Sequence, residues 1–183
     1  MSHLAIVKKS MHNYLHDPKK MNLPEGYLIR ANSTNKKVLT VKLWRGDNPL
    51  AYVVLEFVPF GEKKVMMTLD GGTYPAHRQK GIGTLIRALV TKAALNSGVN
   101  NIHHLGLNVE NLSAKKLAAN EGISLNNAKA RNPVPLSTKI VRKLGYAPRN
   151  EEFGNHQSYM TPSMSRVKLN NAIKRIKSEL NPV

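Results

Sequence analysis

Residues 78–83 read Arg-Gln-Lys-Gly-Ile-Gly and join an apolar, strand-like run, Val65 to Leu69, to a strongly periodic helix that begins at Ile82. The main-chain N–H groups of a helix start point at one spot, where the helix dipole adds partial positive charge. The two glycines let an anion approach the main chain without a Cβ in the way, and the arginine and lysine add mobile charge. The stretch therefore predicts a strand, a phosphate-binding turn and a helix.

The spacing of the glycines excludes two common phosphate loops. A P-loop requires Gly, four residues and then Gly-Lys-Ser/Thr, and no such run occurs in the chain. A dinucleotide fingerprint requires G-x-G-x-x-G, and its third glycine position is occupied here by Ile86. What remains is Arg-x-x-Gly-x-Gly. A helix start that merely contains glycine and binds nothing is the alternative interpretation.

The surroundings of this loop carry a resemblance to a known family. Thr73-x-Pro75 precedes the loop, a strand-like run from Ile102 to Val109 with Asn111 follows the helix, and Lys143-Leu144-Gly145-Tyr146 stands further on. This order resembles the GCN5-related N-acetyltransferase superfamily over about residues 36–160.

The resemblance implies an α/β (α+β) fold: a mixed, mostly antiparallel twisted sheet with a β-α-β crossover that carries a pyrophosphate loop. Length favours one domain over residues 1–183, with a core at about 25–162 and a basic C-terminal helix at about 165–180. The expected strands are 27–31, 39–43, 50–58, 65–69, 102–109 and 156–160, and the expected helices are 4–15, 82–95, 113–120, 138–144 and 165–180.

The co-substrate implied by the resemblance is acetyl-CoA. The residues predicted to bind it are Thr73, Tyr74, Arg78, Gln79, Lys80, Gly81, Ile82, Gly83, Thr84 and Asn111. Gly71-Gly72 predicts a bulge or a close backbone approach in the preceding strand. The resemblance implies that pantetheine lies between two splayed strands there, and that a main-chain N–H near Thr73 polarises the thioester carbonyl.

An amine must lose a proton before it attacks a thioester, so a general base is expected. Asp70 is the only acid between Val65 and Lys80 and is the first candidate, with Glu110 second and His104 third. Partial burial would raise the pKa of Asp70 toward a useful value. A turn-forming role before Gly71 is the alternative for this residue.

Two departures from the family pattern stand out. The tyrosine that protonates the leaving thiolate in many members is replaced here by Val141, so Tyr74 or Tyr146 would have to substitute, or the thiolate departs unprotonated. The two helices that usually follow the first strand are also missing, because residues 32–36 form only a turn. The N-terminal helix or the 122–135 loop, with Lys129 and Arg131, would then line the acceptor site.

The charge of the chain widens the choice of partners. Lys and Arg number 28 against 11 Asp and Glu, a formal net charge of +17, which attracts nucleic acid, the ribosome or an acidic protein unless it serves solubility alone. The second functional hypothesis is therefore a nucleic-acid-binding protein on a catalytically degenerate scaffold. The tail helix is predicted to dock on its own core or on a second copy in a homodimer.

Cysteine is absent, which removes disulfides, thiolate metal sites and a cysteine acyl-enzyme. No apolar stretch approaches the roughly 18 residues of a membrane span, and lysines interrupt the N-terminal apolar run. The seven histidines show no closed metal-ligand spacing with acids, so no metal is predicted. Together these features favour a cytoplasmic location.

Overall fold

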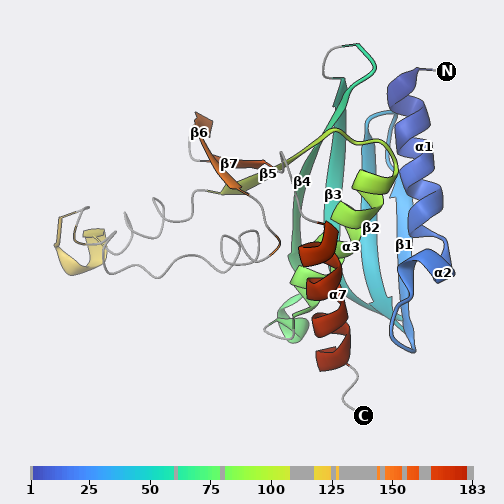
Figure 1. Ribbon diagram of the computed structural model, residues 1–183. Helices are drawn as coiled ribbons and strands as arrows, with labels where there is room; N and C mark the ends of the chain where they lie inside the picture. The colour runs from blue at the N-terminus through green and yellow to red at the C-terminus, as the bar shows by residue number, and fades with distance from the viewer. Residues whose placement is uncertain are drawn as a thin grey trace.

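The fold is seen in a computed structural model (Figure 1) that describes residues 2–59, 62–78, 81–107, 118–124, 127, 144, 147–153, 156–160 and 166–180. Its helices are α1 (His3–Leu15), α2 (Pro18–Met21), α3 (Ile82–Asn96) and α7 (Arg166–Leu180), with a 3-10 turn η1 (Pro75–His77). Its strands are β1 (Tyr27–Ser33), β2 (Val38–Arg45), β3 (Asn48–Pro59), β4 (Val65–Thr73), β5 (Asn101–Leu107), β6 (Ala147–Phe153) and β7 (His156–Met160).

The described strands form one seven-stranded sheet in the order β1-β2-β3-β4-β5-β7-β6. Every neighbouring pair is antiparallel except β4 and β5, which are parallel and joined through α3. The mixed, mostly antiparallel sheet with one β-α-β crossover is therefore confirmed.

Alternating side chains on the first four strands divide the sheet into a buried face and an open face. The residues of β2 and β3 that point to the helices, such as Leu39, Val41, Val53 and Leu55, have no exposed surface. Figure 1 shows α1, α3 and α7 gathered over this face. The intervening residues, such as Tyr52, are half-buried or exposed. This period-two burial is what the sequence pattern predicts for a sheet covered on one side.

The N-terminal helical region differs in detail from the prediction. α1 is capped by Ser2, whose Oγ accepts from Ala5 N, and it ends at Leu15 as expected. Asp17 and Pro18 do not simply stop this helix, because Asp17 caps α2 and Pro18 stands at the start of that helix. Proline is favourable in a first helical turn, where no N–H partner is needed.

The tail helix α7 packs on its own chain. Leu169, Ile173 and Ile176 are almost fully buried, and α7 lies beside α3 in Figure 1. Lys177 Nζ donates to the main-chain oxygens of Met21 and Asn22, so this lysine ties α7 to the end of α2. Desolvation, followed by repulsion from the Lys92 charge, lowers the pKa of Lys177.

Several predicted boundaries of helices and strands were wrong, and others lie outside the described residues. β6 was not predicted, because its sequence contains a proline and two glutamates and lacks an apolar alternation. β3 begins at Asn48, inside the expected turn. Residues 118–121 are helical, as expected for the segment 113–120, and the rest of that segment lies outside the described residues. Of the expected helix at 138–144 only Leu144 is described, and it is buried.

Candidate active site

The loop between β4 and α3 ends in a helix start to which the described part of the chain supplies no side-chain cap. Gly81 is the N-cap residue, with a φ of 71° in the left-handed region that glycine adopts most readily. The first intrahelical bond runs from Leu85 N to Gly81 O at 2.9 Å. The N–H groups of the three preceding residues therefore lie before the helical ladder, and the first turn contains no acid. This end of α3 is suited to an anion.

The strands β4 and β5 separate close to this helix start. Their parallel pairing runs from Met66 with Asn101 to Leu69 with His104 and goes no further. β4 then continues to Thr73 along β3, and β5 continues to Leu107 along β7. Each strand keeps only its outer neighbour beyond this point, so the inner edges of both strands lose their mutual hydrogen bonds. This is the splayed pair that the resemblance implied.

At the end of β4, the main-chain N–H and C=O groups of every second residue point toward this opening. Tyr74 N donates to Leu50 O of β3 at 3.1 Å. Because hydrogen-bonding directions alternate along an antiparallel strand, the N–H and C=O groups of Gly71 and Thr73 point away from β3 and toward the β5 side. The carbonyl of Gly71 indeed accepts from Arg87 Nη2 of α3 at 2.6 Å. The Thr73 N–H thus points toward the opening between β4 and β5.

Arg87 ties the helix start to the end of β4. Its buried guanidinium donates to Gly71 O and also, at 3.1 Å, to Gly83 O. Arg78 Nε donates to Thr73 O at 3.4 Å from the loop itself. Sequence reasoning missed Arg87, although a charged residue inside an otherwise apolar helical stretch was the signal that could have revealed it.

Two glycines allow the close contacts that this arrangement requires. A Cβ on Gly71 would lie 2.3 Å from the main-chain oxygen of Tyr52 and 2.7 Å from Val53 Cα. A Cβ on Gly83 would lie 2.5 Å from Thr73 Oγ1. The predicted close backbone approach is therefore confirmed. The alternative prediction of a bulge is wrong, since β3 and β4 pair without a register shift through Thr73.

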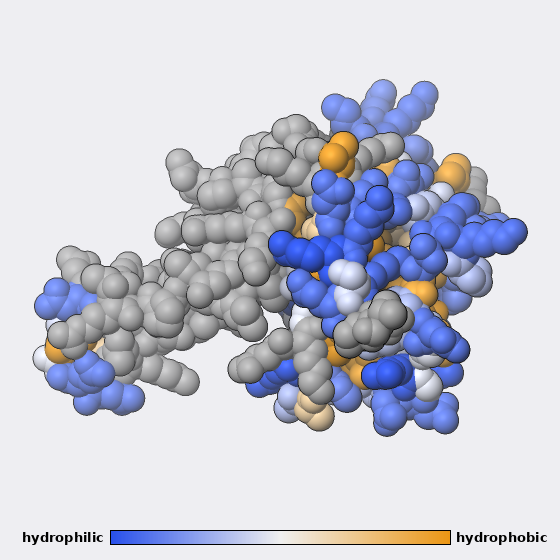
Figure 2. All heavy atoms as spheres, turned by 60° about the horizontal axis from the view of Figure 1, so that its bottom comes forward, coloured by the Kyte–Doolittle hydropathy of each residue, from blue (hydrophilic) through white to orange (hydrophobic). Residues whose placement is uncertain are grey.

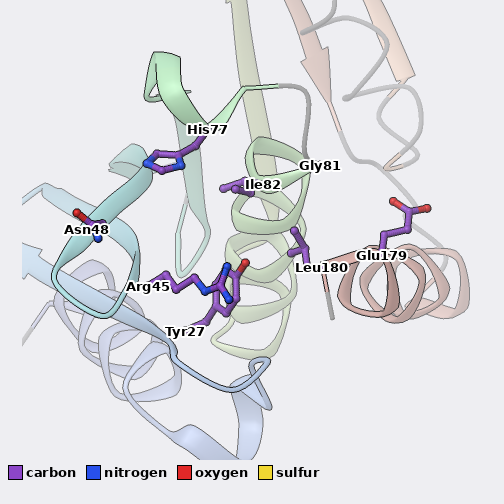
Figure 3. Close-up of a pocket in the computed structure, with 8 residues that line it drawn as sticks. All are labelled: Tyr27, Arg45, Asn48, His77, Gly81, Ile82, Glu179 and Leu180. Atoms are coloured by element: carbon purple, nitrogen blue, oxygen red, sulfur yellow. The ribbon is translucent and has the colours of Figure 1, made fainter. Parts of the chain in front are cut away.

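A pocket of about 620 Å³ adjoins the helix start (Figure 3). Gly81, Ile82 and His77 line it from the loop and α3, and Glu179 and Leu180 line it from the last turn of α7. The opposite wall consists of three residues at the ends of β1, β2 and β3: Tyr27, Arg45 and Asn48.

The described residues that line this pocket include one positive side chain, Arg45, and one carboxylate, Glu179. The Arg45 guanidinium lies over the Tyr27 ring, 5.5 Å from its centroid, and the single carboxylate among the described lining residues, Glu179, is 3.7 Å from Arg175 Nε. Figure 2, which brings this end of the molecule forward, shows hydrophilic side chains over much of the described surface.

The carboxylate of the predicted base Asp70 is not buried. Its side chain is exposed, and its Oδ1 accepts from Gly71 N at 2.6 Å. That bond matches the turn-forming interpretation of an Asp before glycine. The residue nevertheless lies directly after Leu69, the last position of β4 that pairs with β5, and so at the start of the opening.

An aromatic pair, which sequence reasoning also missed in part, lies on the open face beside Asp70. The rings of Tyr52 and Tyr74 have centroids 5.8 Å apart. The ring of Tyr52 covers Gly72, and its hydroxyl would be 3.5 Å from a Cβ placed on that glycine. Two phenols therefore stand near the end of β4, where only Tyr74 was expected.

Other predicted site residues lie outside the described residues. These are Gln79, Lys80, Glu110, Asn111, Lys129, Arg131, Val141 and Tyr146. His104 is placed in β5 by its main chain alone. Within the described part of the chain, no group of three or more histidine and acidic side chains could hold a metal ion. In the same residues, no helix combines the length and apolar character of a membrane span.

The sequence matches no protein-family model and no curated protein. Many solved structures resemble the fold. The GNAT domain of PAT from S. lividans is 11% identical to this chain with a TM-score of 0.47. The match covers 68% of this chain and 60% of that one. RimJ from Mycobacterium smegmatis, in complex with CoA-disulfide, is 11% identical with a TM-score of 0.48, at 75% and 61% coverage.

A third structure, the PaiA N-acetyltransferase of Thermoplasma acidophilum in complex with coenzyme A, is 10% identical with a TM-score of 0.45, at 68% and 60% coverage. The chain thus spans about three fifths of the length of these structures. The strand order, the parallel and splayed β4–β5 pair and the crossover helix α3 agree with the fold that the sequence resemblance implies.

Proposed function

We propose that the protein is an acetyl-CoA-dependent N-acetyltransferase that acetylates a primary amine by direct attack. The single observation that carries this proposal is the meeting of two features: the separation of β4 from β5 after Leu69, and the uncapped start of α3 at Gly81. The first offers an unpaired main-chain edge to an extended amide-bearing chain, and the second offers N–H donors to a diphosphate. Acetyl-CoA contains both parts.

The residues present fit this co-substrate. The N–H groups of Ile82, Gly83 and Thr84, with Arg78 beside them, are the donors for the diphosphate. Gly83 is buried and has no room for a side chain, because a Cβ there would lie 2.5 Å from Thr73 Oγ1. Gln79, Lys80 and Asn111 are proposed to add to this site, as the resemblance implies.

Bound acetyl-CoA would supply an acetyl group activated as a thioester. The Thr73 N–H is proposed to donate to the carbonyl oxygen on which negative charge develops. Asp70, as an exposed carboxylate at the edge of the opening, is proposed to accept the proton of the attacking ammonium, with Glu110 as the second candidate. The attacking nitrogen forms the new C–N bond as the C–S bond breaks, and the thiolate leaves.

Tyr52 and Tyr74 are the described phenols near the opening from which the leaving thiolate could take a proton. Because a thiol has a pKa near about 8.5, this proton is useful but not essential at neutral pH. A residue in the place of the family tyrosine is therefore not required for turnover. The acceptor is proposed to be an amine associated with nucleic acid or the ribosome, in view of the +17 charge.

Isothermal titration with acetyl-CoA, followed by mass spectrometry of candidate amines incubated with labelled acetyl-CoA, tests the proposal. We expect saturable heat for the wild type and transfer that falls at least about tenfold in Asp70→Asn with binding retained. Glu56→Gln, an exposed acid on the neighbouring strand, is the control and should behave like the wild type. No heat from acetyl-CoA would contradict the proposal.

A nucleic-acid-binding protein on an inactive acetyltransferase scaffold is the second candidate. A cluster of lysines at the opposite end of the sheet, described below, favours it. It predicts steeply salt-dependent nucleic-acid binding without acetyl transfer to any amine. An enzyme whose acceptor is carried by nucleic acid would show both activities, so the transfer assay separates the two candidates.

A further inference from the structure

A groove of about 750 Å³ lies at the end of the sheet farthest from the α3 start. It runs between the first turns of α1, the turn after β1 and the end of β3. Leu4, Ala5 and Pro59 contribute its apolar surface. This groove shares no lining residue with the pocket beside Gly81.

Lysines form the rim of this groove, and one of them is part of its framework. Lys8 is almost fully buried and donates from Nζ to Ser33 Oγ at 2.5 Å and to Asn35 O, which fixes α1 to the turn after β1. Burial lowers the pKa of Lys8. Lys9, Lys36 and Lys37 are exposed around it, so three ammonium groups face solvent along a single groove.

Negative charge is scarce in this region. None of the described residues that line the groove is acidic, and His12 adds an imidazole to the lining. Lys63 and Lys64 extend the positive charge onto the turn after β3, since Pro59 pairs with Val65 across that turn. Glu62 is the acid of this turn and is followed directly by the two lysines.

We propose that this lysine-rimmed groove binds a single-stranded nucleic acid. Mobile ammonium groups with an apolar floor between them match a chain of phosphates that carries flat, apolar base faces. Three lysines without acidic partners can neutralise successive phosphates and release their counterions, which makes binding salt-dependent. The net charge of +17 adds long-range attraction for such a polyanion. This inference is independent of the proposed acetyl transfer.

Fluorescence anisotropy of a labelled 12-nucleotide single-stranded RNA, measured across a series of salt concentrations, tests the site. The variant combines Lys9→Gln, Lys36→Gln and Lys37→Gln, which leaves the structural Lys8 in place. We expect its affinity to fall at least about tenfold at low salt and the slope of log K against log salt to become shallower by roughly 2. The control, Lys19→Gln, Lys20→Gln and Lys174→Gln, removes equal charge elsewhere and should keep the wild-type slope.

Equal slopes in the two triple variants would overturn the proposal, because the general charge and not the groove would then bind the RNA. Stronger binding to vesicles with anionic lipids than to RNA, lost in the groove variant, would also overturn it in favour of a membrane partner. A DNA strand of the same sequence measures the contribution of the 2′-hydroxyl. Heat from acetyl-CoA should be unchanged in both triple variants, so failure of this site and failure of the proposed enzyme activity are distinguishable.

Discussion

The two ends of the sheet present positive charge in different ways. At the carboxyl end of β4, the partial charges belong to main-chain N–H groups that are held in place by Gly81 and Arg87. At the other end, the charges belong to the exposed side chains of Lys9, Lys36 and Lys37. The strand β3 runs between the two ends, and its 12 residues span roughly 36 Å.

This difference separates two kinds of anion. Fixed N–H donors lose little entropy when they bind, and they select a compact ligand of one geometry, such as a diphosphate. Lysine side chains are flexible and screened by salt, and they tolerate an extended ligand of variable shape. The fixed N–H donors would therefore suit a small co-substrate, and the flexible lysines at the other end would suit a polymer.

The largest expected effect on stability concerns the main chain at the carboxyl end of β4. Gly71→Ala places a Cβ 2.3 Å from a main-chain oxygen that cannot move aside, and we expect a loss of about 3 kcal/mol in the free energy of unfolding. Gly72→Ala is the matched control, because its Cβ meets only the Tyr52 ring at 3.4 Å and should cost less than about 1 kcal/mol. Chemical denaturation of both variants measures the difference, and equal stabilities would contradict the described β3–β4 contact.

Arg87→Met tests the connection between α3 and β4. The variant loses two hydrogen bonds from a buried charged group, so we expect about 2–3 kcal/mol of destabilisation and weaker acetyl-CoA binding. Lys92→Met, on the same helix, should change the unfolding free energy by less than about 1 kcal/mol. Denaturation curves and acetyl-CoA titrations of the two variants provide the comparison. A variant of Arg87 with wild-type affinity for acetyl-CoA would remove this residue from the site.

Arg78→Gln sharpens the distinction between the two ends. It removes one mobile charge beside the helix start, and we expect the Kd for acetyl-CoA to rise about tenfold while RNA affinity changes less than about twofold. The triple groove variant should show the reverse pattern. Both ligands are titrated into both proteins at one salt concentration. If each variant weakened both ligands equally, the two ends would not be separate sites.

The smallest expected effect is a dependence of stability on pH that arises from Lys177. Because its pKa is lowered in the folded chain, the unfolded chain binds more protons between that pKa and the usual value near 10.5. Stability should therefore rise slightly with pH through this window. Denaturation of the wild type and Lys177→Met at pH 8 and pH 10 measures the effect, which should be smaller in the variant because Lys8, whose pKa is also lowered, remains there. A rise of the same size in both proteins would assign it to another group.

The first half of the fold could be predicted from the sequence because local patterns carry it. Apolar alternation gave β2 and β3 their buried face, and the Gly81-Ile82-Gly83 turn gave the start of α3. β6 could not be predicted in this way. Its proline and its charged residues do not favour a strand, and pairing with β7 supplies the stability that its own sequence lacks.

The site was predictable where it depends on the main chain and not where it depends on distant contacts. The loop glycines could be predicted from their spacing, and Thr73 was named because of the family resemblance. The contact of Arg87 with Gly71 and that of Tyr52 with Tyr74 could not be predicted, since only the folded chain brings these residues together. Asp70 is exposed because alternation along β4 places this residue on the open face of the sheet.

Amide chemical shifts measured during a titration with acetyl-CoA test the central claim most directly. The claim is that the start of α3 and the open edge of β4 hold this co-substrate through their main chain. We predict saturable shifts of the Thr73, Ile82, Gly83 and Thr84 amides, with the amides of Lys36 and Lys37 unaffected. Unchanged shifts at the first four amides, or shifts confined to the lysine-rimmed groove, would contradict the account.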